Sequence, residues 1–342
     1  MEVNLISDTV TRPTPGMLEA MMQASVGDDV FKEDPTVNAL EQKVADLFGM
    51  EAALFFPSGT MANQTGIKIH TQPGDQLICD KFAHVYNYEG GGVSFNSGVS
   101  CKLIDGDRGM ITAPAVEAAI NPPDFYHSPR TRLVCVENTT NKGGGACYDF
   151  DELKRIKGVC DTHGLAFHLD GARIWNALVA SGQSPLEYGK IFDTISVCLS
   201  KGLGCPVGSL LVGSKSVMDQ ALRVRKVLGG GMRQAGYLAA AGIYALDHQL
   251  ERLGDDHRKA KELGELLKEK PFVRYVAPLE TNIVIFETHS DRVSDQELLK
   301  VLTDKGIRLI GMGQGKLRFV THLDYTDTMH AYVLEVIEGL SF

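Results

Sequence analysis

The sequence predicts an α/β protein with two domains. Seven short apolar runs alternate with segments of helical hydrophobic period up to about residue 250, which is typical of a mostly parallel seven-stranded sheet between helices. Three later apolar runs alternate with two helical patterns, which favours a separate small α+β domain. We therefore expect a large domain over residues 1–250 and a small C-terminal domain over 251–342.

Hydrophobic periodicity places the individual elements. Residues 35–49 carry apolar side chains at helical spacing and end in Gly49, so they predict a helix. The large-domain strands are predicted at 52–56, 76–80, 101–104, 132–137, 165–170, 194–200 and 208–213, with further helices at 61–71, 114–120 and 149–163. A long helix is predicted over 233–269, with a break near Gly254. The tail predicts strands within 282–288, 307–312 and 316–322 and helices at 294–305 and 326–339.

Composition excludes several classes of function. The chain has 342 residues and a formal net charge of -9, which argues against a nucleic-acid or anionic-membrane partner. No stretch approaches 18 uninterrupted apolar residues, and the start of the chain lacks the apolar core of a signal peptide. The seven cysteines form no C-x-x-C pair, so we expect reduced thiols in a cytoplasmic protein, with neither a disulfide framework nor a metal site.

Polar clusters follow four of the predicted strands. They read "PSGT" from Pro57, "ENTTN" from Glu137, "DGAR" from Asp170 and "SKG" from Ser200. In parallel α/β sheets, ligands bind at the carboxyl ends of the strands, so these clusters predict a site at that edge.

Three of these strand ends match the needs of pyridoxal 5′-phosphate. The cofactor requires a lysine, a carboxylate beside its ring nitrogen and a phosphate cup, which Lys201, Asp170 and the Ser58-Gly59-Thr60 turn would supply at a helix N-terminus. His84 would stack on the ring. Each residue also has a plainer interpretation, namely an Asp170–Arg173 pair, a lysine extending into solvent and a helix N-cap.

Longer motifs strengthen this interpretation. The chain resembles the low-specificity L-threonine aldolases, fold-type I pyridoxal-phosphate enzymes of the β-eliminating lyase group. The resemblance is carried by "SDTVTRPT" at 7–14, "GDDVFKEDPTVNALE" at 27–41, "FPSGTMANQ" at 56–64, "HLDGARIWNA" at 168–177, "CLSKGLGCPVGS" at 198–209 and "LGGGMRQAG" at 228–236. It implies a pyridoxal-phosphate domain, a small C-terminal domain, and a homotetramer built from two dimers that share active sites.

The resemblance also implies roles for individual residues. Lys201 corresponds to the Schiff-base lysine, and the glycines after it would leave room for the cofactor; Arg173 and Arg318 would hold the substrate carboxylate with help from Ser7. His84 and His127 would meet the β-hydroxyl group, and Tyr88 would line the aldehyde pocket. Arg233, with Lys226 as a further candidate, would reach the cofactor phosphate of a neighbouring subunit. Thr140 stands where the family often has a histidine.

The expected activity is that of an aldehyde-lyase: reversible retro-aldol cleavage of L-threonine, L-allo-threonine and related β-hydroxy-α-amino acids to glycine and an aldehyde. The alternatives are an aldolase selective for β-aryl or β-carboxy serines, a related pyridoxal-phosphate lyase, and a catalytically silent binding module. The presence of Lys201, Asp170, Arg173 and Arg318 together argues against the silent module.

Overall fold

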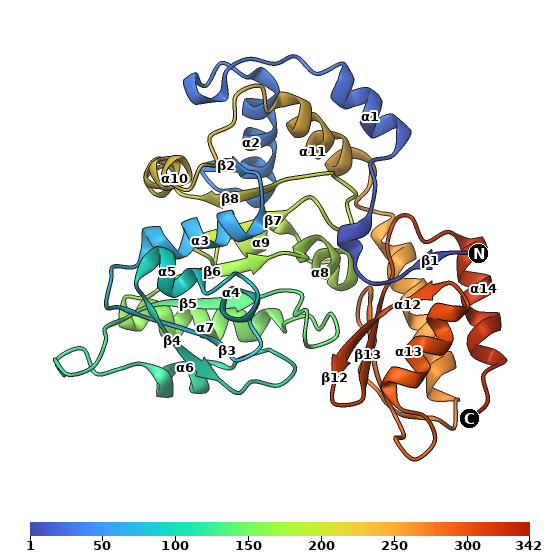
Figure 1. Cartoon of the computed structure of the whole chain (residues 1–342). Coiled ribbons are helices and arrows are strands. Elements are labelled where there is room, and N and C mark those ends of the chain that lie inside the picture. Colours follow the sequence, from blue (N-terminus) through green and yellow to red (C-terminus); the bar gives the residue numbers. More distant parts are fainter.

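The computed structural model describes all 342 residues. Its large domain is built on one seven-stranded sheet with helices on both faces (Figure 1). In spatial order the strands are β2 (Ala52–Phe56), β8 (Ser209–Gly213), β7 (Thr194–Cys198), β6 (Ala166–Gly171), β5 (Thr131–Glu137), β3 (Gln76–Asp80) and β4 (Ser100–Ile104). Only β8 runs opposite to the other six strands, so the predicted mostly parallel sheet is confirmed.

The predicted helices of the large domain are also present. They are α2 (Pro35–Phe48), α3 (Gly59–His70), α6 (Ala113–Ala119) and α7 (Phe150–His163). The Asp34 side chain caps α2 by accepting from Thr36 N and Val37 N, and Gly49 ends it at φ +61°. None of the helices in the chain combines the length and apolar character that a membrane span requires.

Several helices were not predicted, and the break in the predicted long helix lies a few residues before its expected position. The additional helices are α1 (Pro15–Met22), α4 (His84–Asn87), α5 (Gly92–Ser97), α8 (Ile174–Ser181), α9 (Pro185–Gly189) and α10 (Lys215–Val227). The long helix at 233–269 is two helices, α11 (Gly236–His248) and α12 (Leu253–Lys268). The break falls at 249–252, because the buried Gln249 ends α11 and Leu253 turns into the core; Gly254 lies inside α12.

The small domain packs three helices against an antiparallel sheet. The sheet order is β12 (Ile310–Gly313), β13 (Lys316–Val320), β10 (Ile283–Thr288) and β9 (Val273–Val276), and the helices are α12, α13 (Asp295–Asp304) and α14 (Asp327–Glu338). The N-terminal strand β1 (Val3–Asn4) pairs with β11 (Ile307–Arg308), so the start of the chain joins this domain (Figure 1). The chain then crosses to the large domain at residues 8–12.

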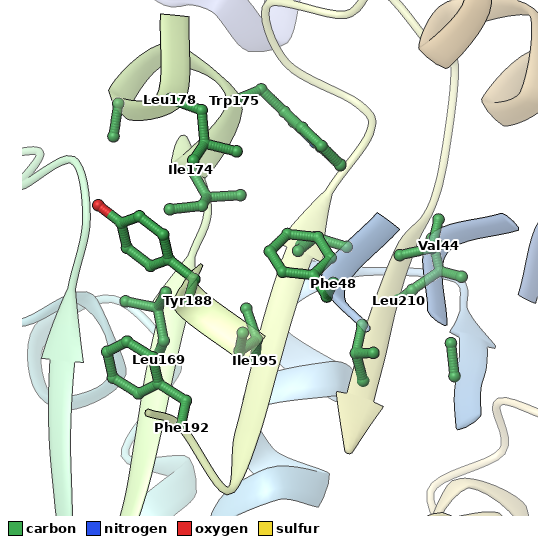
Figure 2. Packing of buried hydrophobic residues seen from close by; sticks show 14 of the residues in the cluster. Val44, Phe48, Leu169, Ile174, Trp175, Leu178, Tyr188, Phe192, Ile195 and Leu210 are labelled. Atoms are coloured by element: carbon green, nitrogen blue, oxygen red, sulfur yellow. The ribbon is translucent and has the colours of Figure 1, made fainter. Parts of the chain in front are cut away.

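Two main apolar clusters stabilise the chain. The larger one contains 42 buried residues and joins α2, α8 and the central strands (Figure 2). Within it, Phe48 and Trp175 lie 5.7 Å apart, and Phe167 stacks on Phe192 at 4.2 Å. A separate cluster of 19 buried residues holds the small domain together and includes Val3 and Leu5. The boundary at residue 250 stays a prediction, which this division of the core supports.

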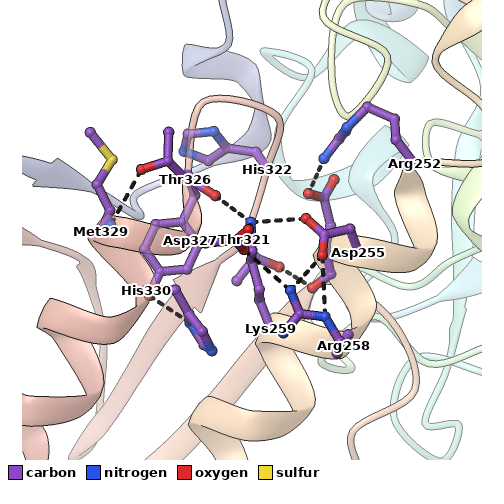
Figure 3. Close-up of polar contacts among 12 residues, drawn as sticks. Arg252, Asp255, Arg258, Lys259, Thr321, His322, Thr326, Asp327, Met329 and His330 are labelled. Carbon is purple, nitrogen blue, oxygen red and sulfur yellow. Dashed lines mark hydrogen bonds and ion pairs between the residues drawn. The ribbon is translucent and has the colours of Figure 1, made fainter.

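A buried lysine connects two helices of the small domain. Lys259 on α12 donates to Tyr325 O at 2.8 Å and contacts Asp255 at 2.8 Å and Asp327 at 3.1 Å (Figure 3). Its side chain is 5% exposed, so the ammonium depends on these partners in place of water. This contact fixes the N-terminus of α14 against α12.

We expect Lys259→Met to lower the free energy of unfolding by roughly 1–3 kcal/mol, because it leaves the buried Tyr325 carbonyl without a donor. Urea denaturation measures the loss. Lys261→Met on the same helix is the matched control, since Lys261 is exposed and should be nearly neutral. Equal midpoints for the two variants would contradict the structural role of Lys259.

Candidate active site

A cavity of about 270 Å³ lies at the carboxyl ends of the central strands. It brings together six residues predicted from the sequence: Ser58, Gly59, Thr60, His84, Asp170 and Lys201. They come from four separate segments, the start of α3, the start of α4, the end of β6 and the loop after β7. The parallel sheet produces this convergence, since it aligns the carboxyl ends of its strands.

Lys201 borders the cavity from the loop between β7 and β8. Its carbonyl accepts from Thr11 Oγ1 at 3.0 Å and from Gly204 N at 2.8 Å, which fixes the backbone that carries the amine. The following glycines have a packing role. A Cβ at Gly202 would lie 2.8 Å from Leu253, and one at Gly204, where φ is +76°, would lie 2.7 Å from Leu323. They allow the loop to pack against α12 and the C-terminal segment, which differs from the expected role of leaving room for a cofactor.

Asp170 has one oxygen without a partner. Its Oδ1 accepts from Ala172 N at 3.1 Å, while its Oδ2 is buried and has no hydrogen bond. The alternative of a structural Asp170–Arg173 pair is wrong, because Arg173 pairs with Asp8 instead. A buried carboxylate oxygen facing a cavity favours a ligand with a proton to donate.

The N-terminus of α3 forms another wall of the cavity. Ser58 is its N-cap and accepts from Met61 N at 3.2 Å. The first N–H groups of a helix have no partner within the helix and favour an anion. Gly59 sits close to the neighbouring strands, since a Cβ there would lie 3.3 Å from Ser209 Oγ, another buried atom without a partner. This corner can hold a phosphate group.

His84 lies in an acidic environment. Its Nδ1 is 2.9 Å from Glu89 Oε1, and one side-chain atom each of His84, Glu89 and Asp170 lie within 4.8 Å of one another. Burial alone lowers the pKa of His84, but the hydrogen bond that its ring donates to Glu89 and the charge of Asp170 outweigh it and raise the pKa. Glu89 is held in turn by Asn63 Nδ2 at 2.9 Å and Gln64 Nε2 at 2.6 Å. The surrounding carboxylates therefore stabilise the protonated form of His84.

Two arginines near the cavity carry the same charge in different electrostatic environments. Arg173 binds Asp8 through two hydrogen bonds of 2.8 and 2.7 Å. Burial raises the pKa of Asp8, but the Arg173 charge and hydrogen bonds outweigh it and lower the pKa to about 2. Arg318 donates only to neutral oxygens, Asn141 Oδ1 at 2.7 Å and Ile6 O at 3.1 Å, and its buried Nε has no partner. Burial and the nearby Arg173 charge lower the pKa of Arg318 to about 10.

This arrangement leaves one cation without an anion. The Arg173 charge is balanced by Asp8, whereas Arg318 is 8% exposed and contacts no carboxylate. A buried, unbalanced guanidinium is costly unless a ligand supplies the anion. Arg318 therefore offers a positive charge that a carboxylate ligand would balance.

The remaining predicted residues lie at the rim. Ser7 caps the turn Asp8–Val10, since its Oγ accepts from Thr9 N at 3.2 Å, and Thr9 rather than Ser7 lines the cavity. Tyr88 is 47% exposed, and its ring centroid lies 5.6 Å from that of His84. Thr140, at the position of the family's histidine, is buried and donates to Arg108 O at 2.9 Å, which is a structural role.

His127 does not reach the cavity of its own chain. It lies in the exposed loop before β5, where it packs on Tyr126 at 4.0 Å. Figure 1 shows the segment between α6 and β5 projecting from the large domain, away from the small domain. This loop enters β5 at its amino end, and the cavity lies at the carboxyl ends of the strands. Within one chain, the direction of β5 places His127 at the edge of the sheet opposite the cavity, so its predicted contact with the β-hydroxyl stays a prediction.

Arg233 is also outside the cavity. Its side chain is 54% exposed and pairs with Asp28 at 2.8 Å. Lys226 lies nearby, since a Cβ at Gly231 would lie 3.8 Å from its Nζ. Neither side chain contributes to the cavity within one chain, so a role toward a neighbouring subunit stays a prediction.

The structure adds lining residues that sequence reasoning missed. They are Thr9, Pro57, Asn63, Ala172, Ser196, Cys198, Ser200, Pro206 and Val207. Pro57, Ala172 and Ser200 lie within the predicted strand-end clusters, so those clusters contained a signal for them. Asn63 lies one turn into α3, so its place in the sequence indicated a cavity residue less clearly. Its Oδ1 accepts from Ser196 Oγ at 2.5 Å and lies 3.2 Å from His168 Nε2.

Comparisons with known proteins agree with this geometry. The beta-eliminating lyase family matches residues 4–291. Low-specificity L-threonine aldolase 1 of Arabidopsis thaliana is 42% identical over 98% of this chain and 95% of its own length. The low specificity L-threonine aldolase of Escherichia coli strain K12 is 46% identical over 78% of this chain and 79% of its own. A solved threonine aldolase of Leishmania major superposes with a TM-score of 0.84 at 20% identity, covering 98% of both chains. The predicted fold-type I architecture is confirmed.

Proposed function

Because this chain belongs to the low-specificity L-threonine aldolases of the beta-eliminating lyase family, we propose that it cleaves L-threonine, L-allo-threonine and related β-hydroxy-α-amino acids reversibly to glycine and an aldehyde. It is an aldehyde-lyase. The observation that carries the proposal is one cavity that presents the Lys201 amine, the unpartnered Asp170 Oδ2 and a helix N-terminus together.

The cavity fits pyridoxal 5′-phosphate, which we propose as the cofactor. Lys201 would hold its aldehyde carbon, Asp170 its ring nitrogen, the Ser58-Gly59-Thr60 turn its phosphate, and His84 the face of its ring. When bound, the cofactor supplies a sink for the electron pair released at the substrate's Cα. The orphaned Asp170 oxygen is the strongest sign of fit, because a protonated ring nitrogen would satisfy it.

The chain's own residues orient the substrate and move its proton. Arg318 binds the substrate carboxylate through its uncompensated charge, and Arg173, held rigid by Asp8, supports the same anion. Fixing the carboxylate sets the rotation about Cα, and therefore which bond of the substrate is aligned for cleavage. His84 accepts the β-hydroxyl proton, directly or through one water, and Glu89 holds its ring and stabilises the charged form. Tyr88 borders the space for the departing aldehyde.

We further propose a cytoplasmic homotetramer with shared active sites. Arg233 supports sharing, because it is exposed, lies outside its own cavity and follows the glycine run 229–231, in which Gly229 has φ +82°. Exposed apolar side chains also occur nearby, among them Phe31 at 69% and Val227 at 80%. Sedimentation equilibrium tests the assembly.

Glycine release tests the activity. The purified protein is incubated with pyridoxal 5′-phosphate and both diastereomers of threonine, phenylserine and 3-hydroxyaspartate. We expect release from both L-threonine diastereomers. Release from the aryl or carboxy substrates alone would favour the selective aldolase, and cofactor binding without release from any substrate would overturn the proposed function.

Arg318→Ala should raise the KM for L-allo-threonine by on the order of 100-fold, since it removes a buried guanidinium that no carboxylate balances. Arg318→Lys should recover only part of the loss, because an ammonium cannot reproduce the fork of a guanidinium. Steady-state kinetics gives both values. The exposed Arg274, on the outer strand β9, supplies the matched control Arg274→Ala. A KM unchanged in Arg318→Ala would place the carboxylate elsewhere.

A further inference from the structure

Glu137 is a buried carboxylate that the proposed chemistry does not use. It ends β5, is 5% exposed, and lies in register with Asp170 on the neighbouring strand β6. Burial and the nearby Asp170 charge raise the pKa of Glu137 to about 7. A buried acid beside another acid destabilises the fold unless it makes contacts that a neutral side chain cannot. Its hydrogen bonds show what those contacts are.

Both carboxylate oxygens of Glu137 accept backbone N–H groups from separate segments. Oε2 accepts from His84 N at 2.9 Å, and Oε1 accepts from Asn141 N at 2.8 Å. The residue before α4 is Ala83, whose side chain cannot cap the helix. Glu137 therefore supplies from another strand the acceptor that a serine or aspartate would normally provide. This contact fixes the backbone that carries His84.

The second contact continues to the substrate-binding arginine. Asn141, whose N–H is held by Glu137, accepts from Arg318 Nη1 through its Oδ1 at 2.7 Å. Arg318 has only one other hydrogen-bond acceptor, Ile6 O at 3.1 Å. The position of its guanidinium thus depends on Asn141, and through it on Glu137.

We propose that Glu137 is a positioning residue for aldol cleavage: its carboxylate holds His84 through one oxygen and, through Asn141, holds Arg318 by the other. The proposal rests on the proposed function. A substrate must present its carboxylate to Arg318 and its β-hydroxyl to His84 at the same time. One rigid carboxylate that ties both groups sets the distance between them, which a pair of independent loops would not do.

The two branches can be measured separately. Glycine has a carboxylate and no hydroxyl, so its affinity for the cofactor-loaded protein, measured by calorimetry, reports on Arg318 alone. The kcat for L-allo-threonine reports on the His84 branch. In Glu137→Gln the amide keeps one acceptor oxygen and turns a donor toward one of the two N–H groups. We expect glycine affinity and kcat each to fall by about tenfold.

Asn141→Ala perturbs the Arg318 branch alone. It should weaken glycine binding by about tenfold and lower kcat less than Glu137→Gln does, because the bond from His84 N to Glu137 remains. In the double variant, adding Glu137→Gln to Asn141→Ala should cost no further glycine affinity but should lower kcat as in the single Glu137→Gln variant. If Glu137 only stabilised the fold, glycine affinity and kcat would not respond differently in this way.

Glu41→Gln is the matched control. Glu41 is also buried, has a raised pKa, and accepts a backbone N–H, from Phe55 at 2.9 Å, but it lies outside the cavity. This variant should lose stability while keeping glycine affinity and kcat. Two results would overturn the proposal. One is a double variant in which Glu137→Gln and Asn141→Ala lower glycine affinity independently of one another. The other is an Asn141→Ala variant whose glycine affinity stays within about twofold of wild type. The glycine affinity of Asn141→Ala still tests the proposal even if Glu137→Gln fails to fold. A wild-type protein that binds glycine but releases none from any substrate would instead overturn the proposed function.

Discussion

Lys201→Ala is expected to abolish the visible absorption of the cofactor-loaded protein at roughly 410–430 nm, which requires a lysine bonded to the cofactor. Glycine release should fall by on the order of 10³-fold or more, since losing a covalent catalytic group has effects of that size or larger. No other lysine lines the cavity, so no neighbour can replace the amine. Absorption spectroscopy and a glycine assay measure the two effects.

Lys142→Ala is the control for this variant. Lys142 Nζ lies 5.4 Å from the centroid of the Tyr88 ring, so it is a lysine near the rim without access to the cavity. This protein should keep the visible band. Retention of the band in Lys201→Ala, or its loss in Lys142→Ala, would contradict the assignment of Lys201.

Asp170→Asn should leave the cofactor bound but reduce kcat by on the order of 10²–10³-fold, the usual cost of removing one group that stabilises charge in the transition state. We expect this loss because Asp170 Oδ2 is buried and has no hydrogen-bond partner within the protein. A carboxylate there stabilises a protonated ring nitrogen, whereas an amide is neutral and can turn an N–H toward it. Cofactor titration and single-turnover kinetics separate binding from chemistry.

Asp75→Asn provides the comparison for Asp170→Asn. Asp75 is a buried carboxylate that accepts Gln72 N at 2.7 Å, just before β3 and at the opposite edge of the sheet from the cavity. The Asp75→Asn variant should have a lower free energy of unfolding but an unchanged kcat. A normal chemical step in Asp170→Asn would show that another group stabilises the ring nitrogen.

Local patterns determined much of this fold. All seven strands of the large sheet were predicted, because strands covered on both faces are rich in apolar residues, as in the fully buried β3, β7 and β8. Polar residues at the ends of such strands are exceptions to that pattern and therefore stand out. For this reason Asp170, Lys201 and the Ser58-Gly59-Thr60 turn could be assigned to one site before any coordinates were known.

Long-range pairing was decided only by the tertiary structure. Asp8 and Arg173 are 165 positions apart, and Asn141 and Arg318 are 177 apart, so no spacing rule indicates either contact. The sequence offered Asp170 as the partner of Arg173 because it is close in the chain, whereas the folded N-terminal segment supplies Asp8. The position of His127 depends on the fold in the same way: it precedes β5, and the direction of that strand places it at the edge of the sheet opposite the cavity of its own chain. Periodicity is a local property of the chain, while the partner of a buried charge is the group that the whole fold brings within about 3–4 Å of it.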